Sequence, residues 1–294
     1  MKKHFYGGQA VIEGVMIRGL KNCVVAVRNT QNEIIINEIK IPSFSKSIYK
    51  KIPFFRGVII LVEMMVIGYR SLTKSSEIVE ESEEGELSNL EKVFSYIFSS
   101  AFLIIVLSLF FLVPLFLSDR IMFIEDNYVI NNILEGIIRL IFFILYVYII
   151  GLNKDIKRVF AYHGAEHKTI AAYEDNVEIN SNNISKIQRY NKEHPRCGTS
   201  FIMTVIVVSI VLHVFIPREP ALLLYLSRIL LFPIIAGLSY ELIRLSSMTS
   251  ENIISKLLSL PNIWMQKLTT AEPEDEMVEV ALAAINESIR LDSK

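Results

Sequence analysis

Two histidines and a glutamate lie within one short segment of the chain, His163-Gly164-Ala165-Glu166-His167. On an α-helix, side chains at positions i, i+3 and i+4 lie on one face, so these three groups would project together. Two imidazoles at this spacing can bind one divalent ion, and a neighbouring carboxylate can act as a ligand or a general base. The order His-x-x-Glu-His is the reverse of the zinc-protease motif and is known from inverzincins. The segment therefore predicts a divalent-metal site, with zinc as the expected ion.

Further possible ligands follow along the chain. His194 and Cys197 lie just before a long apolar block, and Glu241 lies near the end of a later one. A thiolate, a third imidazole or a carboxylate could complete a tetrahedral zinc site with His163 and His167. We therefore expect metal ligands among these five residues. Glu166 is the expected catalytic base, activating a water molecule for metal-assisted hydrolysis.

Each residue of this set also has an ordinary structural explanation. The two imidazoles of the motif could bind lipid headgroups, and Cys197 could be a small buried apolar residue. Glu241 could pair with Arg244 on the next helical turn. Cys197 could also act as a nucleophile beside His167. For the set as a whole, the paired histidines favour a metal site over these alternatives.

The elements that must position these groups are strongly apolar. Hydrophobic residues make up 52% of the chain, and they are concentrated in long blocks with almost no charge. A bilayer core ~30 Å thick needs about 20 apolar residues in a helix. Four blocks approach or reach this length: 96–117, 133–152, 201–216 and 221–243. The sequence therefore predicts a mainly α-helical, polytopic membrane protein with about four transmembrane helices.

The distribution of basic residues predicts the orientation. Lysine and arginine are abundant in 153–200 and before the first apolar block, whereas 118–132 holds Arg120 alone. An excess of basic residues marks the cytoplasmic side. Both termini and the histidine-containing loop are therefore expected in the cytoplasm, with the chain in the inner (plasma) membrane. The net charge of −1 gives no indication of a nucleic-acid partner.

These patterns divide the chain into six parts. They are a β-rich cytoplasmic cap (1–45), an interfacial or re-entrant helix with an acidic linker (46–94), two transmembrane helices (95–152), the cytoplasmic loop with the metal site (153–200), two further transmembrane helices (201–245) and a cytoplasmic helical tail (246–294).

Three local signals support this division. In the cap, β-branched runs at 24–28 and 34–39 flank a polar turn and predict a hairpin. The stretch 54–72 is apolar but contains Arg56, Glu63 and Arg70, so whether it spans the membrane or re-enters is left open. In the tail, an apolar stripe at helical spacing over 277–289 predicts an amphipathic helix.

Five ordered blocks of the sequence resemble a known family. The blocks are GGQAVIEGVMIRG, AYHGAEHKTIAAYE, HPRCGTSF, AGLSYELIRL and PNIWMQKLTTAEPEDEMVEVA. They are similar to the YqhQ-like family of bacterial membrane proteins, an uncharacterised family of predicted metal-dependent enzymes. The resemblance implies site residues His163, Glu166, His167, His194, Cys197 and Glu241. It also implies that the N-terminal segment around Gln9, Glu13, Arg18 and Gly19 folds over the same site.

Three functions remain open from the sequence. The first is a zinc hydrolase or protease at the cytoplasmic membrane interface, with the lipid bilayer and a peptide or lipid-linked substrate as partners. The second is a non-catalytic scaffold or transport-associated protein with a structural metal or polar cluster. The third is a transporter whose path is lined by Glu63, Glu135, Arg139 and Arg228. An open coordination position beside a cavity would favour the first over the second.

Overall fold

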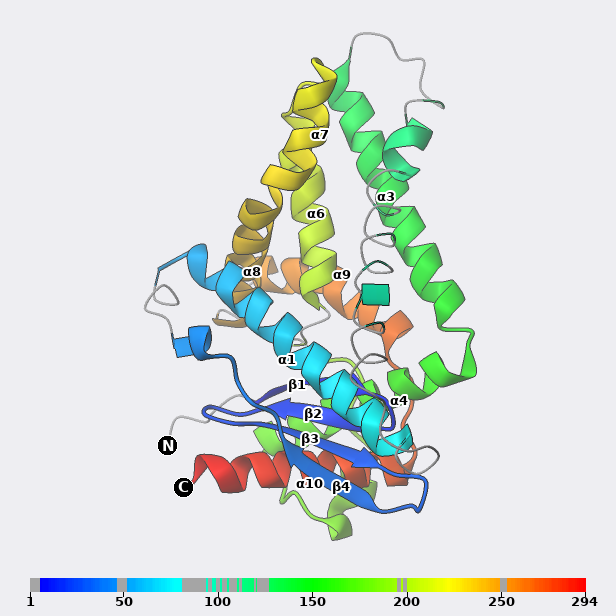
Figure 1. Ribbon diagram of the computed structural model, residues 1–294, viewed down its shortest axis with the longest axis vertical. Helices are drawn as coiled ribbons and strands as arrows, with labels where there is room; N and C mark the ends of the chain where they lie inside the picture. Colours follow the sequence, from blue (N-terminus) through cyan, green and yellow to red (C-terminus); the bar gives the residue numbers. More distant parts are fainter. Residues whose placement is uncertain are drawn as a thin grey trace.

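The computed structural model describes residues 6–46, 52–80, 127–194, 197, 200–248 and 253–294, with isolated positions and one short helical stretch between 94 and 120. One end of the molecule is a layered unit of strands and helices, and long helices extend from it toward the other end (Figure 1). The predicted combination of a mainly helical chain with a small N-terminal β-rich part is confirmed.

The N-terminal part is a four-stranded antiparallel sheet. Its strands are β1 (Gly7–Val11), β2 (Gly14–Arg18), β3 (Cys23–Arg28) and β4 (Ile34–Glu38). They pair in sequence order. The predicted hairpin corresponds to β3 and β4, with Val24 opposite Glu38 and Arg28 opposite Ile34. The glycine-rich run before it forms the second hairpin of the same sheet.

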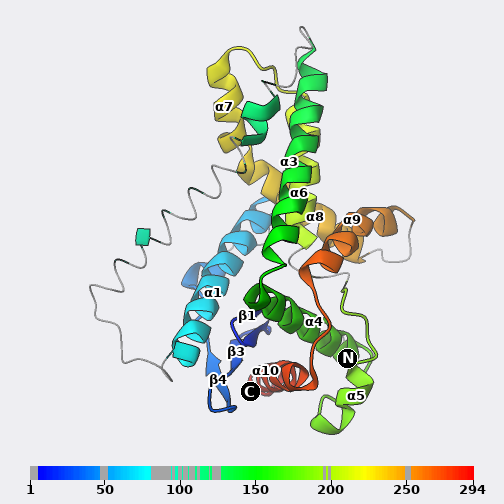
Figure 2. The same ribbon diagram turned by 90° about the vertical axis from the view of Figure 1, so that its right-hand side faces the viewer.

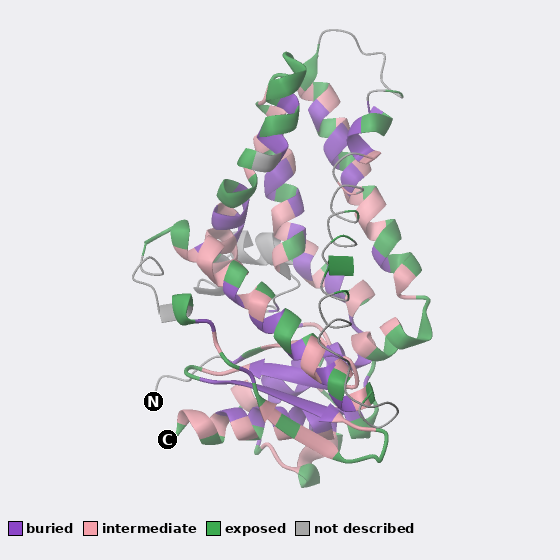
Figure 3. Ribbon diagram, in the orientation of Figure 1, coloured by how far each residue is buried: buried purple, intermediate pink, exposed green. Residues whose placement is uncertain are grey.

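Helices cover both faces of this sheet. Helix α1 (Phe55–Glu80) lies on one face, and α4 (Lys154–Glu174) and α10 (Asp275–Asp292) lie on the other (Figure 2). Successive side chains of a strand point to opposite faces. Thus Val15 and Ile17 pack with α4 and α10, whereas Met16 packs with Ile67 of α1. Burial on both faces explains why β2 and β3 are apolar without alternation (Figure 3).

The C-terminus is bonded to the turn between β2 and β3. The Asp292 carboxylate accepts hydrogen bonds from the backbone N–H groups of Leu20 (2.8 Å) and Lys21 (3.0 Å) and from Asn22 Nδ2 (2.7 Å). Ser288 Oγ also donates to Asn22 Oδ1 at 2.8 Å. The two ends of the chain therefore form a single packed unit.

The remaining long helices form a separate bundle. They are α3 (Tyr128–Ile150), α6 (Ser200–Val214), α7 (Ala221–Leu230), α8 (Phe232–Met248) and α9 (Ile253–Thr269). Helix α6 packs against α3, α8 and α9, and α1 joins the bundle through α8. The short elements η1 (Ser43–Lys46), η3 (Ser181–Asn183) and α5 (Ile184–Ile187) complete the described secondary structure.

Only part of the predicted set of membrane spans has a counterpart in the described residues. Helix α3 is long and apolar enough to cross a membrane, and the pair 221–228 and 232–245 passes the same test if it is one bent span. Helix α6 is apolar but shorter. The block 96–117 lies largely outside the described residues. Four spans therefore remain a prediction.

Two local expectations differ from the structure. The block 221–243 is two helices that meet at 44° and not one continuous helix. The predicted helical tail contains two helices, α9 and α10, although the amphipathic pattern located only the second; α9 continues through Pro261. The stretch 54–72 lies within α1, and the buried Glu63 in its middle pairs with Arg18 of β2 at 3.2 Å.

A buried ionic cluster lies inside the bundle. Glu135 of α3 accepts hydrogen bonds from Arg139 (2.6 Å), from Arg228 of α7 (2.8 Å) and from Arg218 (3.3 Å). Glu135 and Arg139 are four residues apart, so they lie on the same face of α3. A carboxylate that three guanidinium groups share neutralises charge that would otherwise be costly in an apolar bundle. Glu135 therefore joins α3 to α7.

Replacing Glu135 by glutamine tests whether this carboxylate holds α3 and α7 together. Removing one partner of a buried ion pair costs about 3–5 kcal/mol, because the remaining charges stay buried without compensation. We expect Glu135→Gln to lower the melting temperature of the detergent-purified protein, followed by circular dichroism. The matched control is Glu287→Gln, which removes the carboxylate of an exposed pair with Arg290 in α10 and should have little effect. Equal losses in the two variants would contradict the structural role of the cluster.

Candidate metal centre

Helix α4 carries the histidine motif, and its sequence explains where it begins and how closely it packs. Asn153 caps its first turn, with Oδ1 accepting from the N–H groups of Asp155 (2.7 Å) and Ile156 (3.4 Å). Gly164, between the two histidines, allows the chain after α9 to approach, since a Cβ there would collide with the carbonyl oxygen of Ala271. The segment from His163 to Ile170 is buried as a result.

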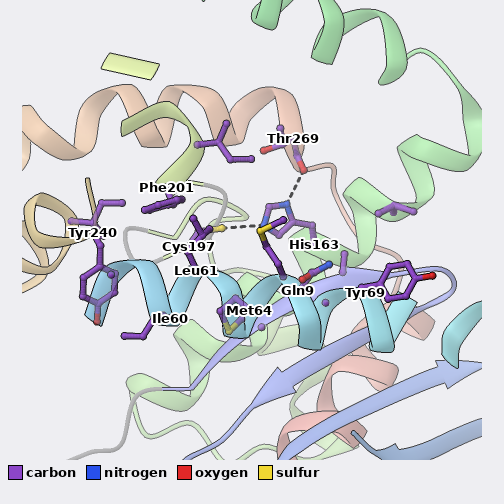
Figure 4. Close-up of a pocket in the computed structure, with 18 of the residues that line it drawn as sticks. Gln9, Ile60, Leu61, Met64, Tyr69, His163, Cys197, Phe201, Tyr240 and Thr269 are labelled. Carbon is purple, nitrogen blue, oxygen red and sulfur yellow. Dashed lines mark hydrogen bonds between the residues drawn. The ribbon is translucent and has the colours of Figure 1, made fainter. Parts of the chain in front are cut away.

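Three potential ligands converge in the structure. Potential ligand atoms of His163, His167 and Cys197 all lie within 4.8 Å of one another, and all three residues are buried. His163 Nε2 is 3.2 Å from Cys197 Sγ, and the centroids of the two imidazole rings are 4.3 Å apart. Figure 4 shows His163 between Cys197 and Thr269. The two histidines therefore lie on one face of α4, as their spacing predicts, and Cys197 is brought to them from a separate segment.

The hydrogen bonds of the two imidazoles fix their tautomers. Nδ1 of His163 lies 2.8 Å from the carbonyl oxygen of Thr269, and Nδ1 of His167 lies 2.5 Å from that of Lys192. A carbonyl oxygen can only accept, so each Nδ1 carries a proton, and in the neutral imidazole Nε2 is then the nitrogen with the lone pair. Nε2 of His167 is buried and lies near the Cys197 thiol.

This donor set fits a zinc ion. Zinc prefers nitrogen and sulfur ligands, and a ligating histidine usually donates its other N–H to a carbonyl or carboxylate. Burial lowers the pKa of His167 and so favours the neutral imidazole that a metal requires. The arrangement of two imidazoles and one thiol therefore satisfies both the ligand chemistry and the outer hydrogen bonds of such a site.

Glu166 projects from the same face of α4 toward strand β1. A Cβ added to Gly8 would lie 2.8 Å from the Glu166 carboxyl group, so the strand approaches closely only because this position is glycine. Burial raises the pKa of Glu166 to about 8, with the nearby His163 and the Gly8 N–H opposing that shift and Cys197 adding to it. Oε2 of Glu166 is buried and makes no hydrogen bond to any residue that the structure describes.

The other two expected ligands lie outside this group of three. The ring of His194 is 5.8 Å from that of His167, and its Nε2 is 3.2 Å from Glu174 Oε2. Glu241 of α8 is paired with Arg56 of α1, and its Oε1 accepts from the N–H of Phe54 at 3.1 Å. The structure thus gives Glu241 the role of joining α1 to α8.

Of the N-terminal residues that the resemblance implied, Gln9 and Glu13 lie near the site, whereas Arg18 pairs with Glu63 and Gly19 lies against α10. Glu13 forms an ion pair with Arg158 of α4 (2.5 Å) and accepts from the Tyr162 hydroxyl (3.2 Å). Gln9 of β1 lines the cavity next to the metal centre. The carbonyl groups of Thr269 and Lys192 could not be found from the sequence, because every residue has a carbonyl group.

A cavity of about 630 Å³ adjoins the metal centre, with His163 and Cys197 in its wall (Figure 4). Helix α1 forms a large part of the lining through Ile60, Leu61 and Met64, and Phe201 of α6 and Tyr240 of α8 contribute further. The volume is within the range of about 300–1,000 Å³ that ligand pockets occupy.

Comparison with known proteins is consistent with the resemblance of the sequence blocks. The protein family described as "Protein of unknown function (DUF1385)" matches residues 52–291. The protein of Bacillus subtilis (strain 168) described as "Uncharacterized protein YqhQ" is 38% identical over 310 residues, covering all of this chain and 96% of the relative. The chain belongs to this YqhQ-like family. No solved structure matches it.

The contact between Glu166 and β1 can be tested at two adjacent glycines. Gly8→Ala would force the strand away from the Glu166 carboxyl and from the Met16 carbonyl oxygen, and overpacking of this kind costs about 1–3 kcal/mol. Gly7→Ala is the matched control, since a Cβ there meets nothing within 4 Å. We expect a lower melting temperature for Gly8→Ala and little change for Gly7→Ala. Indistinguishable variants would show that β1 does not pack on Glu166.

Proposed function

We propose that this protein is a polytopic membrane enzyme that binds one zinc ion at the cytoplasmic membrane interface and hydrolyses a carbonyl-containing substrate. One observation carries the proposal: potential ligand atoms of His163, His167 and Cys197 lie within 4.8 Å of one another, and the Nδ1 atoms of both histidines are bonded to backbone carbonyls. This arrangement leaves each Nε2 available to a metal beside the Cys197 sulfur.

The number of ligands supports catalysis over a purely structural role. Three protein ligands with an open fourth position are typical of catalytic zinc sites, whereas structural sites have four. The cavity beside His163 and Cys197 gives a substrate access to that position. When bound, zinc supplies Lewis acidity, which polarises a carbonyl group and makes water more acidic.

The residues of the chain have separate roles in this proposal. His163 and His167 bind through Nε2, and the carbonyls of Thr269 and Lys192 orient their rings. Burial raises the pKa of Glu166 to about 8, and a cation bound beside it would favour the ionised form. In that form Glu166 would accept a proton from the attacking water at Oε2 and later pass it to the leaving group, as a general base and acid. Oε2 suits this role because it is buried beside the ligands and is not occupied by another described donor. The walls of the cavity exclude bulk water.

The membrane location rests on the apolar helices and the distribution of charge. Helix α3 and the bent pair α7–α8 have the required composition, and the buried Glu135 cluster matches the way in which charged groups are accommodated inside membrane bundles. The metal-binding α4 follows α3 directly and belongs to the loop rich in lysine and arginine. These features support a site at the cytoplasmic surface with both termini on that side.

A structural metal is the second candidate, and one observation favours it. His194 lies beside His167, so a change of its rotamer could supply a fourth ligand and close the site. In that case the protein would be a scaffold or transport-associated protein. An X-ray absorption spectrum of the metal-loaded protein distinguishes the two, because four protein ligands indicate a structural site and three indicate an open one.

Metal analysis of the purified protein tests the ligand assignment. We expect one equivalent of zinc per chain, and a loss of most of it in His163→Ala, His167→Ala and Cys197→Ala, because each change removes a donor. Cys23→Ala and Glu241→Gln are the controls, since Cys23 is buried in the sheet and Glu241 is bound by Arg56. Folded wild-type protein without stoichiometric metal would refute the proposal.

Substitution of Glu166 separates metal binding from catalysis. Glu166→Gln keeps the shape of the side chain but removes the proton acceptor, so we expect full zinc content and a rate of hydrolysis lower by about 10²–10⁴-fold. The measurement is turnover of fluorogenic ester and amide substrates, with zinc determined on the same samples. A Glu166→Gln variant that is as active as the wild type would exclude the assigned role.

A further inference from the structure

The cavity beside the metal centre has an unusual lining for a site that would act on a polar substrate. Among the described residues that line it, none is charged, and aliphatic, aromatic and methionine side chains predominate. The polar side chains that contribute are few, and two of them, His163 and Cys197, belong to the metal centre. A cavity of about 630 Å³ with such walls favours an apolar occupant.

One side of the cavity is lined by residues on the exposed surface of the helices. Its lining includes Met65 and Tyr69 of α1 and Ile202 of α6, which are 57%, 46% and 46% exposed although they are large apolar or aromatic residues. Exposed apolar side chains at the edge of a cavity indicate a mouth that meets an apolar environment. Under the membrane location proposed above, that environment is the outer part of the bilayer core next to the cytoplasmic headgroups.

The lining also distinguishes between two kinds of apolar occupant. A peptide segment would bring backbone N–H and C=O groups into the cavity, and each buried group without a hydrogen bond is costly. The described walls offer little compensation, because the carbonyl of Thr269 is already bound to His163 Nδ1 and the remaining lining is largely hydrocarbon. A hydrocarbon chain needs no such partners and fits the walls as they are.

We propose that the cavity holds the hydrocarbon chain of an acylated lipid, and that the substrate of the zinc site is the ester or amide bond at the end of that chain. This inference rests on the proposed function and names its substrate class. In the reaction, the oxygen of water forms a bond to the acyl carbon and the bond from that carbon to the ester oxygen or amide nitrogen breaks. The proton that Glu166 accepts moves to the leaving group, so the products are a carboxylic acid and an alcohol or amine.

Two adjacent residues of α1 provide a matched pair of variants. Leu61 lines the cavity, whereas Val62 points away from it and is 43% exposed. Leu61→Trp fills the space that a chain would occupy, and Val62→Trp adds the same side chain to the outer surface of the same helix turn. Both variants leave the residues of the metal centre unchanged.

The binding test uses the full-length protein in detergent micelles and a C16 alcohol that carries a photoreactive diazirine near its end. We expect labelling of peptides that contain the cavity residues of α1, and a decrease of roughly tenfold in Leu61→Trp, the factor expected when a filled cavity is overpacked. Val62→Trp should be labelled like the wild type. Equal labelling of all three proteins, or displacement of the probe by an apolar peptide and not by unlabelled C16 alcohol, would overturn the inference.

A second measurement separates this inference from the zinc hydrolase itself. The ratio of kcat/KM for a C16 ester to that for a C4 ester should exceed roughly tenfold in the wild type, since each added methylene gains binding in the cavity. That ratio should fall in Leu61→Trp and persist in Val62→Trp. A zinc-loaded protein that hydrolyses esters without regard to chain length would refute the lipid substrate and leave the hydrolase. A protein that takes up the C16 probe but contains no zinc would refute the hydrolase and leave the chain-binding cavity.

Discussion

Two hydrogen bonds from imidazole N–H groups to backbone carbonyls hold the centre of this molecule together. They join His163 of α4 to the end of α9 and His167 to the segment before α6. Because the acceptors are carbonyl oxygens, the same two bonds decide which nitrogen of each ring can bind a metal. The close approach that they need is possible at Gly164, where α4 contacts the chain after α9. The geometry of the site therefore depends on how α4 packs against the end of α9 and the segment before α6.

The sequence identified those candidate ligands that a local pattern can reveal. The four-residue spacing of His163 and His167 is a helical pattern, and α4 is a helix throughout this region. The β3–β4 hairpin and α10 follow equally local signals. Glu241 was included because it is a carboxylate at the end of an apolar block. Whether it binds a metal or an arginine depends on Arg56, which tertiary packing brings to it from a distant part of the chain.

Other features of the fold have no signature in the pattern of residue types. The carbonyls of Thr269 and Lys192 act through the backbone. The break between α7 and α8 interrupts a continuous apolar block, so hydropathy alone could not locate it. Strands β1 and β2 contain glycines that a sequence pattern assigns to turns, yet Gly8 is needed in a strand because the Glu166 carboxyl occupies the space of a side chain. Each of these differences arises from contacts between segments that are distant in the sequence.

The bonding of Asp292 to the turn after β2 has a consequence for how the protein matures. During synthesis the strands of the sheet leave the ribosome well before α10, which together with α4 covers one of their faces. The Thr269 carbonyl that orients His163 also lies far along the chain from α4. Until these later segments have been made, the part of the sheet that α10 covers is open and His163 lacks this hydrogen bond. The contacts around His163 are thus completed late in folding, only after the end of α9 has reached α4.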